Sequence, residues 1–364
     1  MSKMRPPKFL LVLAVLVLLV SFPLLKNTQE SQKNSYFDSQ LAAAQKMQEL
    51  MAAVNQYKSD NNLVINEEDK IASGLIGERY SGITTTLGDP AAKRTVCQPD
   101  MAALLVRMFK EAGIEKGDKV AASMTGSFPG LNLALFAAAD VLGLDLRYIS
   151  SIGASMYGAN DEALTFPEIA YRLFQDGYIS TAPIAISMGG DRDMGDEMFA
   201  PSRDKVRERV RKLPVFYLEE GDFTKNLKKR RELYGKESEI DCFVSIGGHT
   251  SSLGHDERAL DLGQGVLLKK GQPTHQLAAF KTRRTDKTGL LQYYLGQGTA
   301  VINLLNIKRI CSSYSLPFDP REAQEVLGVS PVYYQKTYNR PLIYITLALT
   351  LALLAVYVIS NRRA

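Results

Sequence analysis

Cysteine and histidine are scarce in this sequence, and their positions exclude the common metal sites. The 364 residues include three cysteines and three histidines. Cys97, Cys242 and Cys311 are odd in number and match no zinc-binding spacing. Cys242 lies in an apolar run typical of a buried strand. A disulfide between Cys97 and Cys311 requires a fold that brings them together, so the sequence leaves that pairing open.

Motifs for nucleotides and metal ions are absent as well. No G-x-G-x-x-G follows an apolar run, no Walker lysine follows a glycine-rich loop, and no H-E-x-x-H occurs. His249 and His255 are six positions apart, which is no known ligand spacing. The run from Asp191 to Asp196 resembles a calcium loop only in its density of carboxylates. We therefore expect no metal ion and no cofactor.

The net charge of +5 is carried by the two ends of the chain. Five of the 44 Lys and Arg residues flank the apolar end segments, which leaves 39 against 39 Asp and Glu elsewhere. The flanking residues are Lys3, Arg5, Lys8, Arg362 and Arg363. Because the rest of the chain is neutral overall, the composition indicates no nucleic acid partner.

Each end of the chain carries an apolar segment long enough to cross a bilayer. Residues 9–25 are apolar apart from Ser21 and Pro23, and no charge interrupts residues 342–359. The first segment also resembles a signal peptide because basic residues precede it, but no small-x-small cleavage site follows. We therefore favour an uncleaved anchor. Since Lys and Arg concentrate on the cytoplasmic side, both termini are expected inside and the middle outside.

These features predict a sequential domain organisation. The expected parts are a cytoplasmic N-terminus (1–8), a transmembrane helix (9–25), a polar stalk (26–35), an amphipathic helix and loop segment (36–98), an extracytoplasmic domain (99–335), a transmembrane helix (341–360) and a cytoplasmic tail (361–364). The helix at 36–57 has an apolar stripe that needs a partner, either the main domain or another subunit.

From Asp100 the chain alternates apolar runs with amphipathic helices, which predicts an α/β fold with an open, mostly parallel sheet and helices on both faces. The expected strands are 119–124, 146–151, 182–188, 214–218, 240–246 and 266–269. The expected helices are 100–112, 131–142, 166–175, 202–213 and 223–234, one or two helices within 289–305, and a short one at 320–327.

Four of these strands end in polar loops that contain glycine. The loops read TGSFPG (125–130), GASMYGAN (153–160), GGDRDMGD (189–196) and GGHTSSLGH (247–255). In a parallel sheet the carboxyl ends of the strands meet at one edge, where ligands bind. The candidate ligand-binding residues are Thr125, Gly126, Ser127, Ser155, Asn160, Asp191, Arg192, Gly248, His249, Thr250 and Ser251.

Two kinds of chemistry fit these loops. Helix N-termini and hydroxyl-rich turns favour a bound carboxylate or phosphate, and this non-covalent reading is the leading one. Covalent catalysis would use Ser127 as nucleophile, His249 as base and Asp191 or Asp193 to orient it. Against catalysis, the first loop lacks the G-x-S-x-G elbow and Pro129 removes an N–H donor. The basic run Lys228–Arg231 is either a solvated helix face or a surface for an anionic polymer or lipid.

With the two spans, the central pattern and these loops in view, the chain resembles the poly-gamma-glutamate system protein family. The resemblance covers nearly the whole length and depends on the stretches 123–134, 151–160 and 245–254 (SMTGSFPGLNLA, SIGASMYGAN and SIGGHTSSLG). It implies a bacterial membrane protein that accompanies the ligase and membrane subunits that make and export γ-linked polyglutamate. It implies no catalytic residue.

The resemblance and the loops lead to one principal expectation with two alternatives. The principal one is a two-span membrane protein whose α/β domain binds the anionic polymer or its synthase partners. The first alternative is a γ-glutamyl hydrolase or transferase that trims or anchors the polymer. The second is a structural scaffold with an empty crevice.

Overall fold

The computed structural model describes residues 8–255, 261–272 and 288–363. The chain divides into two compact units, one formed by Met1–Ser35 with Tyr334–Ala364 and the other by Tyr36–Tyr333. Residues 1–7 and 364, which belong to the expected cytoplasmic ends, lie outside the described residues.

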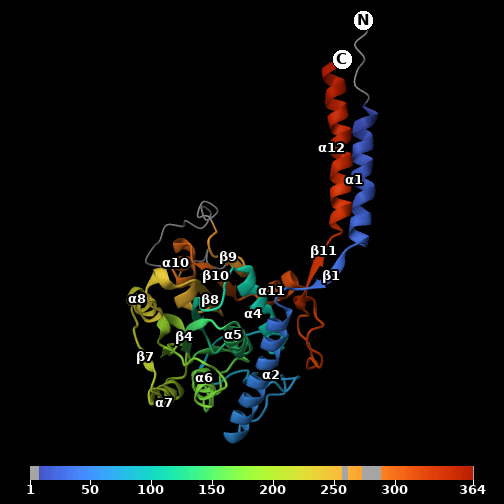
Figure 1. Ribbon diagram of the computed structural model, residues 1–364. Helices are drawn as coiled ribbons and strands as arrows, with labels where there is room; N and C mark the ends of the chain where they lie inside the picture. Colours follow the sequence, from blue (N-terminus) through green and yellow to red (C-terminus); the bar gives the residue numbers. More distant parts are fainter. Residues whose placement is uncertain (1–7, 256–260, 273–287, 364) are drawn as a thin grey trace. The chain divides into compact units, whose positions relative to one another are not determined.

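The first unit is a pair of long helices joined through a two-stranded ribbon. Helix α1 (Phe9–Asn27) packs along α12 (Arg340–Arg363), as Figure 1 shows. Strand β1 (Glu30–Lys33) pairs antiparallel with β11 (Tyr334–Thr337). Both helices are long and apolar enough to cross a membrane. The expected stalk at 26–35 is instead the end of α1 followed by a strand, because the distant segment β11 supplies its hydrogen-bond partner.

The second unit is built on a seven-stranded sheet with the order β7-β6-β4-β3-β8-β10-β9. All neighbouring strands are parallel except β9, which runs antiparallel to β10. The strands are β3 (Lys119–Met124), β4 (Asp145–Ser151), β6 (Ala185–Ser187), β7 (Phe216–Leu218), β8 (Cys242–Ile246), β9 (Gly265–Leu268) and β10 (Ala300–Leu304). A separate short ribbon pairs β2 (Thr84–Thr86) with β5 (Ala154–Ser155).

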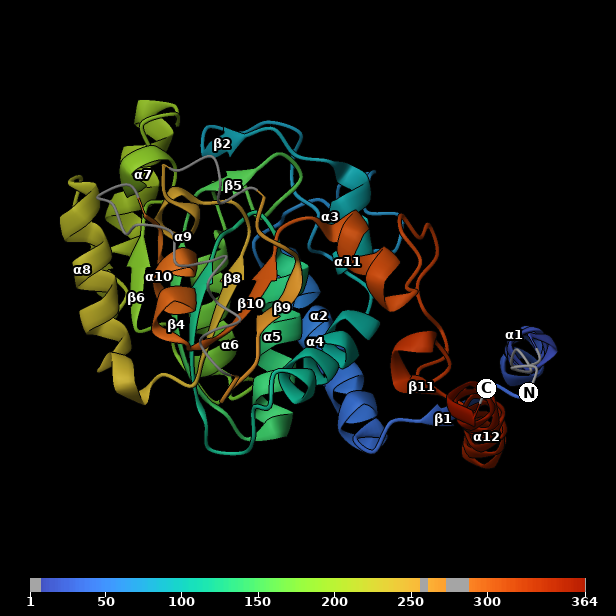
Figure 2. The same cartoon turned by 90° about the horizontal axis from the view of Figure 1, so that it is seen from above.

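Helices cover both faces of this sheet (Figure 2). The helices of this unit are α2 (Phe37–Asp60), α3 (Pro90–Val96), α4 (Asp100–Glu111), α5 (Pro129–Leu142), α6 (Phe166–Gln175), α7 (Ala200–Val210), α8 (Phe223–Tyr234), α9 (Thr250–Leu253), α10 (Leu290–Gln297) and α11 (Ile307–Tyr314). On one face Phe243 of β8 stacks on Tyr294 of α10, with ring centroids 4.6 Å apart. On the other, Tyr148 of β4 meets Phe136 of α5 at 4.9 Å. The predicted α/β class with a mostly parallel sheet is confirmed.

The apolar stripe of α2 is buried within the same unit. Helix α2 packs against α4 and α5, and Ala44, Met47 and Leu50 on it are fully buried. The segment 36–98 is therefore part of the α/β unit, and its loops return over the sheet edge.

The strand order reverses between β3 and β8. From β3 the chain adds β4, β6 and β7 toward one side of the sheet, then returns to place β8 and β10 on the other side of β3. The connections after β3 and β8 consequently diverge to opposite faces, which opens a crevice between their carboxyl ends. This reversal places the loops after Met124 and Ile246 at the crevice.

The helical segment expected at 289–305 is helical only in its first part, and the helix expected at 320–327 is wrong. The segment 289–305 forms one helix, α10, and then strand β10, which lies between β8 and β9. Val301 and Ile302 are β-branched and fully buried, which favours a strand. The backbone of this short apolar run makes its hydrogen bonds within the sheet. Residues 320–327 contain no helix. The helices α3 and α11 were not expected from the sequence.

Candidate functional site

A cavity of about 700 Å³ lies at the carboxyl edge of the sheet, over the switch point. It is bordered by the segments that follow β3, β4, β6, β8 and β10, and by the start of α3. Of the sequence-predicted residues, those that line it are Thr125, Ser127, Ser155, Asp191, Gly248, His249 and Thr250. All four loops predicted from the sequence thus contribute to one cavity, and the segment after β10 is a fifth.

The loop after β3 is held in shape by its own side chains. Thr125 Oγ1 accepts a hydrogen bond from the Ser127 N–H at 3.2 Å. Asn132, one turn into α5, donates from Nδ2 to the Thr125 carbonyl at 2.8 Å. Ser127 Oγ accepts from the Ser155 N–H at 3.0 Å, which ties this loop to β5. The Ser127 hydroxyl therefore contacts another loop of the site.

The two glycines of this loop serve close packing between protein segments. A Cβ on Gly126 would lie 2.9 Å from the Ile152 carbonyl oxygen. A Cβ on Gly130 would lie 2.3 Å from the Val96 carbonyl oxygen at the end of α3. Side chains cannot approach backbone oxygen that closely, so glycine is required where α3 meets the start of α5. Gly130 thereby brings α3 to the edge of the cavity.

Helix α3 carries a buried lysine into the cavity wall. The helix begins with Pro90, and the Asp89 side chain caps it by accepting from the Ala91 N–H at 3.0 Å. Lys93 on this helix is only 2% exposed. Its Nζ donates to Ser155 Oγ at 2.7 Å and to the Ser127 carbonyl, and lies 3.8 Å from the centroid of the Phe128 ring.

In the described part of the chain, the Asp89 carboxylate favours the charge of Lys93 only at a distance. Its ammonium forms no ion pair there, and the adjacent Cys97 is a neutral thiol because burial raises the pKa of Cys97 to about 12. Burial lowers the pKa of Lys93 to about 7. At neutral pH the charged and neutral forms of this amine are therefore both populated.

The loop after β8 does not bring His249 to Ser127. The Nδ1 atom of His249 lies 2.6 Å from Ser251 Oγ, and Nε2 lies 3.1 Å from Ser252 Oγ. Burial and the nearby Arg230 guanidinium hold the pKa of His249 below its usual range, so the ring is neutral at pH 7. Both ring nitrogens are thus occupied by neighbouring hydroxyls.

Asp193 does not line the cavity and forms a buried ion pair with Arg230. Its Oδ2 accepts from Arg230 at 2.6 Å and from Asn226 Nδ2 at 2.9 Å, and its Oδ1 accepts from the Gly189 N–H at 2.9 Å. Arg230 also donates to Ser187 Oγ at 2.8 Å. Asp193 therefore joins α8 to the end of β6, and it makes no hydrogen bond to His249 in this arrangement.

Of the remaining predicted residues, one lines the cavity, one is exposed and one holds the neighbouring loops together. Asp191 and Glu197 line the cavity, and the Asp191 N–H donates to Glu197 Oε1 at 2.6 Å. Arg192 is exposed and pairs with Asp196. Asn160 is buried and donates to the Glu78 carbonyl at 2.8 Å, so it braces the loops behind the cavity.

The segment after β10 adds a cation that the sequence patterns did not reveal. Asn306 and Lys308, at the start of α11, line the cavity. Asn306 caps α11 by accepting from the Arg309 N–H at 3.0 Å. The Lys308 ammonium lies 6.0 Å from the Phe318 ring centroid, and no described carboxylate pairs with it. The first turn of α11 also presents backbone N–H groups, which favour an anion.

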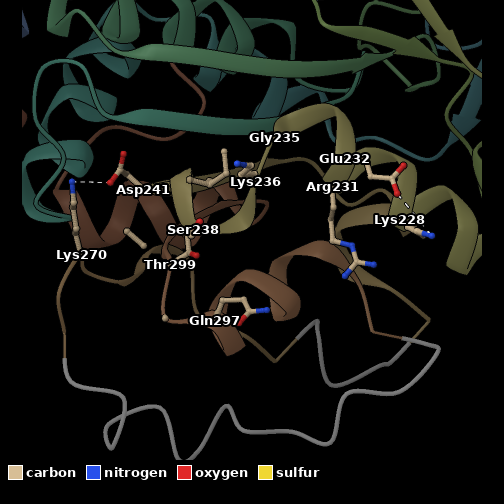
Figure 3. A pocket seen from close by; sticks show the side chains of 13 residues that line it. Lys228, Arg231, Glu232, Gly235, Lys236, Ser238, Asp241, Lys270, Gln297 and Thr299 are labelled. Atoms are coloured by element: carbon tan, nitrogen blue, oxygen red, sulfur yellow. Dashed lines mark ion pairs between the residues drawn. The ribbon is translucent and has the colours of Figure 1, made fainter.

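A second cavity, of about 1190 Å³, lies at the opposite edge of the sheet, beside the starts of β8 and β10 (Figure 3). Its cations are largely paired, because Lys270 contacts Asp118 and Asp241 at 2.9 and 2.8 Å and Lys228 lies 3.9 Å from Glu232. The basic run 228–231 is not one solvated face, since Arg230 points into the core. The first cavity is therefore the stronger candidate.

The first cavity combines hydroxyl groups, a neutral imidazole, two lysines and three carboxylates, which are Asp89, Asp191 and Glu197. Among the residues that the structure describes, no group of three or more His, Cys, Asp or Glu side chains is arranged to hold a metal ion. The three cysteines are buried and unpaired. Such a set suits hydrogen bonding to a polar ligand and proton transfer at a hydroxyl.

Lys93 is another cavity residue that the sequence patterns missed. The Asp89-Pro90 pair is a helix-start signal and would have located α3. No local signal indicates that α3 packs beside the loop after β3.

No protein-family model, curated protein or solved structure matches this chain.

Proposed function

We propose that the α/β unit binds a linear, carboxylate-bearing amide chain along the switch-point cavity. The observation that supports this is the separation of charge along the cavity. Lys308 follows β10 at one end, whereas Asp191 and Glu197 follow β6 at the other. In the sheet order these strands are four spacings apart, or roughly 19 Å at about 4.8 Å per strand. An extended chain with an anionic end and an amino end complements that arrangement.

The basic end of the cavity suits a carboxylate in two ways. Lys308 supplies a positive charge that no described side chain neutralises. The first turn of α11 adds unpaired N–H groups and the positive end of the helix dipole. At the acidic end, Asp191 and Glu197 complement an α-amino group.

We further propose that the bound chain is γ-linked polyglutamate and that the partners are the synthase membrane and ligase subunits. The resemblance of the loops at 123–134, 151–160 and 245–254 to the poly-gamma-glutamate system protein family supports this choice. Polyglutamate has amide bonds, one carboxylate on each residue and a free amino end. Co-purification of both synthase subunits with the tagged full-length chain is the expected result, and their absence would contradict this partnership.

The proposed location is a membrane, with both termini cytoplasmic and the α/β unit outside. Two observations support it. Helices α1 and α12 run antiparallel beside each other, and Lys and Arg flank the ends of both helices that are nearest the chain termini. Protease added to intact spheroplasts should digest the α/β unit. Full protection of that unit would overturn the orientation.

The binding proposal is tested by calorimetric titration of the full-length chain in detergent with γ-linked glutamate oligomers. Lys308→Met is expected to weaken binding roughly tenfold or more, because a charge-assisted hydrogen bond contributes about 1.5–3 kcal/mol. Lys212→Met is the matched control, since Lys212 is exposed and does not line the cavity. Equal affinities of the two variants would contradict the assignment of the carboxylate to Lys308.

A further inference from the structure

Lys93 and Ser155 form the closest pairing of an amine and a hydroxyl in the cavity wall. Their Nζ and Oγ atoms are 2.7 Å apart, both residues line the cavity, and Ser155 is 5% exposed. We propose that these two residues are a catalytic dyad that cleaves an amide bond of a chain bound in the cavity, with Ser155 as nucleophile and Lys93 as general base. The identity of that chain rests on the proposed function, whereas the dyad does not.

The surroundings of Lys93 suit a base better than a permanent cation. The residue is buried, the Phe128 ring covers its amine, and no carboxylate of the described chain forms an ion pair with it. A lysine in such an environment loses its proton far more readily than one in water. The neutral amine has two N–H groups and one lone pair. One N–H satisfies the Ser127 carbonyl, and the lone pair can accept the Ser155 O–H across the same 2.7 Å.

Ser155 is better placed as a nucleophile than Ser127. Its backbone N–H donates to Ser127 Oγ, which fixes the end of β5 against the loop after β3. Its own hydroxyl is left to Lys93. The Ser127 hydroxyl, in contrast, has no titratable side chain as a hydrogen-bond partner among the described residues, and both nitrogens of His249 are taken by Ser251 and Ser252.

The proposed reaction balances with water as the only reactant besides the bound amide. Ser155 Oγ attacks the carbonyl carbon of the amide while its proton passes to the lone pair of Lys93 Nζ. The C–N bond then breaks, and the departing nitrogen takes that proton from Lys93, which leaves an ester on Ser155 and a free amine. Water attacks the ester carbon and gives a proton to Lys93. The ester C–O bond breaks, Ser155 Oγ regains the proton from Lys93, and the carboxylic acid departs. Attack by an amine in place of water would complete a transfer.

Lys93 could alternatively be only a clamp that joins α3 to the loops at Ser127 and Ser155. A clamp makes the same contacts but confers no reactivity on the Ser155 hydroxyl. The two roles are therefore separated by chemical reactivity and its pH dependence rather than by stability.

The test uses the full-length chain in detergent and a fluorophosphonate, which labels activated serines. The expected result is one labelled serine, Ser155, located by peptide mass mapping, with a labelling rate that rises with pH through a midpoint near 7. Ser155→Ala and Lys93→Arg should each reduce labelling at least a hundredfold. Ser59→Ala, on the exposed face of α2, should leave the rate unchanged.

Three results would overturn the dyad: no labelling between pH 6 and 9, labelling at another serine, or a rate at Ser155 that is independent of pH in that range. The wild-type measurement suffices even if Lys93→Arg fails to fold. Oligomer titrations on Ser155→Ala separate this inference from the proposed function. Oligomer binding by Ser155→Ala together with no labelling of Ser155 in the wild type removes the dyad alone. Labelling of Ser155 in the wild type without oligomer binding by Ser155→Ala removes the proposed ligand alone.

Discussion

Arg230 and Asp193 are 2.6 Å apart in a buried ion pair that joins α8 to the segment after β6. The two side chains are 2% and 9% exposed. Asn226 and Ser187 complete the hydrogen bonds around them. Asp193 has a left-handed φ of 63°, which its contacts with Arg230 and the Gly189 N–H hold in place. This pair fixes the segment after β6, in which Gly190 and Asp191 line the cavity.

Asp193→Asn is expected to destabilise the protein by about 3–5 kcal/mol. The substitution leaves the Arg230 guanidinium buried without a counter-charge, and uncompensated buried charges have costs of this size. Chemical denaturation followed by circular dichroism measures the change. Asp196→Asn is the control, because Asp196 pairs with Arg192 on the surface and such pairs contribute about 0–1 kcal/mol. Equal effects of the two substitutions would contradict the structural role of Asp193.

The difference in unfolding free energy between the wild type and Lys93→Met is expected to depend on pH. In the folded chain the pKa of Lys93 is about 7, against an ordinary value of 10.5. Between these values the unfolded chain binds the additional proton, so this residue makes the folded state more stable as pH rises from about 7 to about 10. The slope is at most about 1.4 kcal/mol per pH unit. The measurement is the difference in unfolding free energy between wild type and Lys93→Met at pH 7, 8 and 9. A difference that stays constant over this range would show that Lys93 remains charged.

Gly130→Ala is expected to cost about 1–3 kcal/mol and to lower the melting temperature. The new methyl group would lie 2.3 Å from the Val96 carbonyl oxygen, so α3 must move away from α5. Gly221→Ala is a suitable control, because its nearest neighbour would be a Met194 side-chain atom at 3.6 Å. If Lys93 depends on this contact, Gly130→Ala also slows labelling of Ser155. A melting temperature equal to that of Gly221→Ala would refute the packing argument.

The three cysteines are expected to resist thiol reagents in the folded chain. They are free and buried, and burial raises the pKa of Cys97 to about 12 and that of Cys311 to about 11. Neutral thiols inside the protein react slowly. Ellman's reagent should therefore detect three thiols only after denaturation. Rapid reaction of the native protein, or fewer than three thiols after denaturation without reductant, would contradict the buried, unpaired state.

The strand pattern and the polar loops were predictable from the sequence because both are local properties. Lys119–Met124 and Cys242–Ile246 are short, mainly apolar runs followed by loops that contain glycine, which is the pattern of a buried parallel strand and its loop. Once the sheet is parallel, the loops after these runs must meet at one edge. The switch point between β3 and β8 followed only from the order in which the strands pair.

The contributions that the sequence did not reveal depend on tertiary packing. Lys93 becomes a cavity residue because Gly130 allows α3 to approach α5, and no local pattern encodes that contact. Arg230 is buried within a basic run because Asn226, Arg230 and Tyr234 share the helix face that meets the sheet. The run Ala300–Leu304 fits a strand or a helix by hydrophobicity alone, and its β-branched residues were the available signal for a strand.

The structure of the full-length chain in complex with a γ-linked glutamate oligomer tests the central claim most directly. The proposed function predicts that the oligomer lies along the carboxyl edge of the sheet, with a carboxylate at Lys308, an amide carbonyl beside Ser155 and the amino end toward Asp191. An oligomer bound instead in the cavity beside Lys228 and Lys270, or a switch-point cavity that stays empty at saturating oligomer, would contradict it.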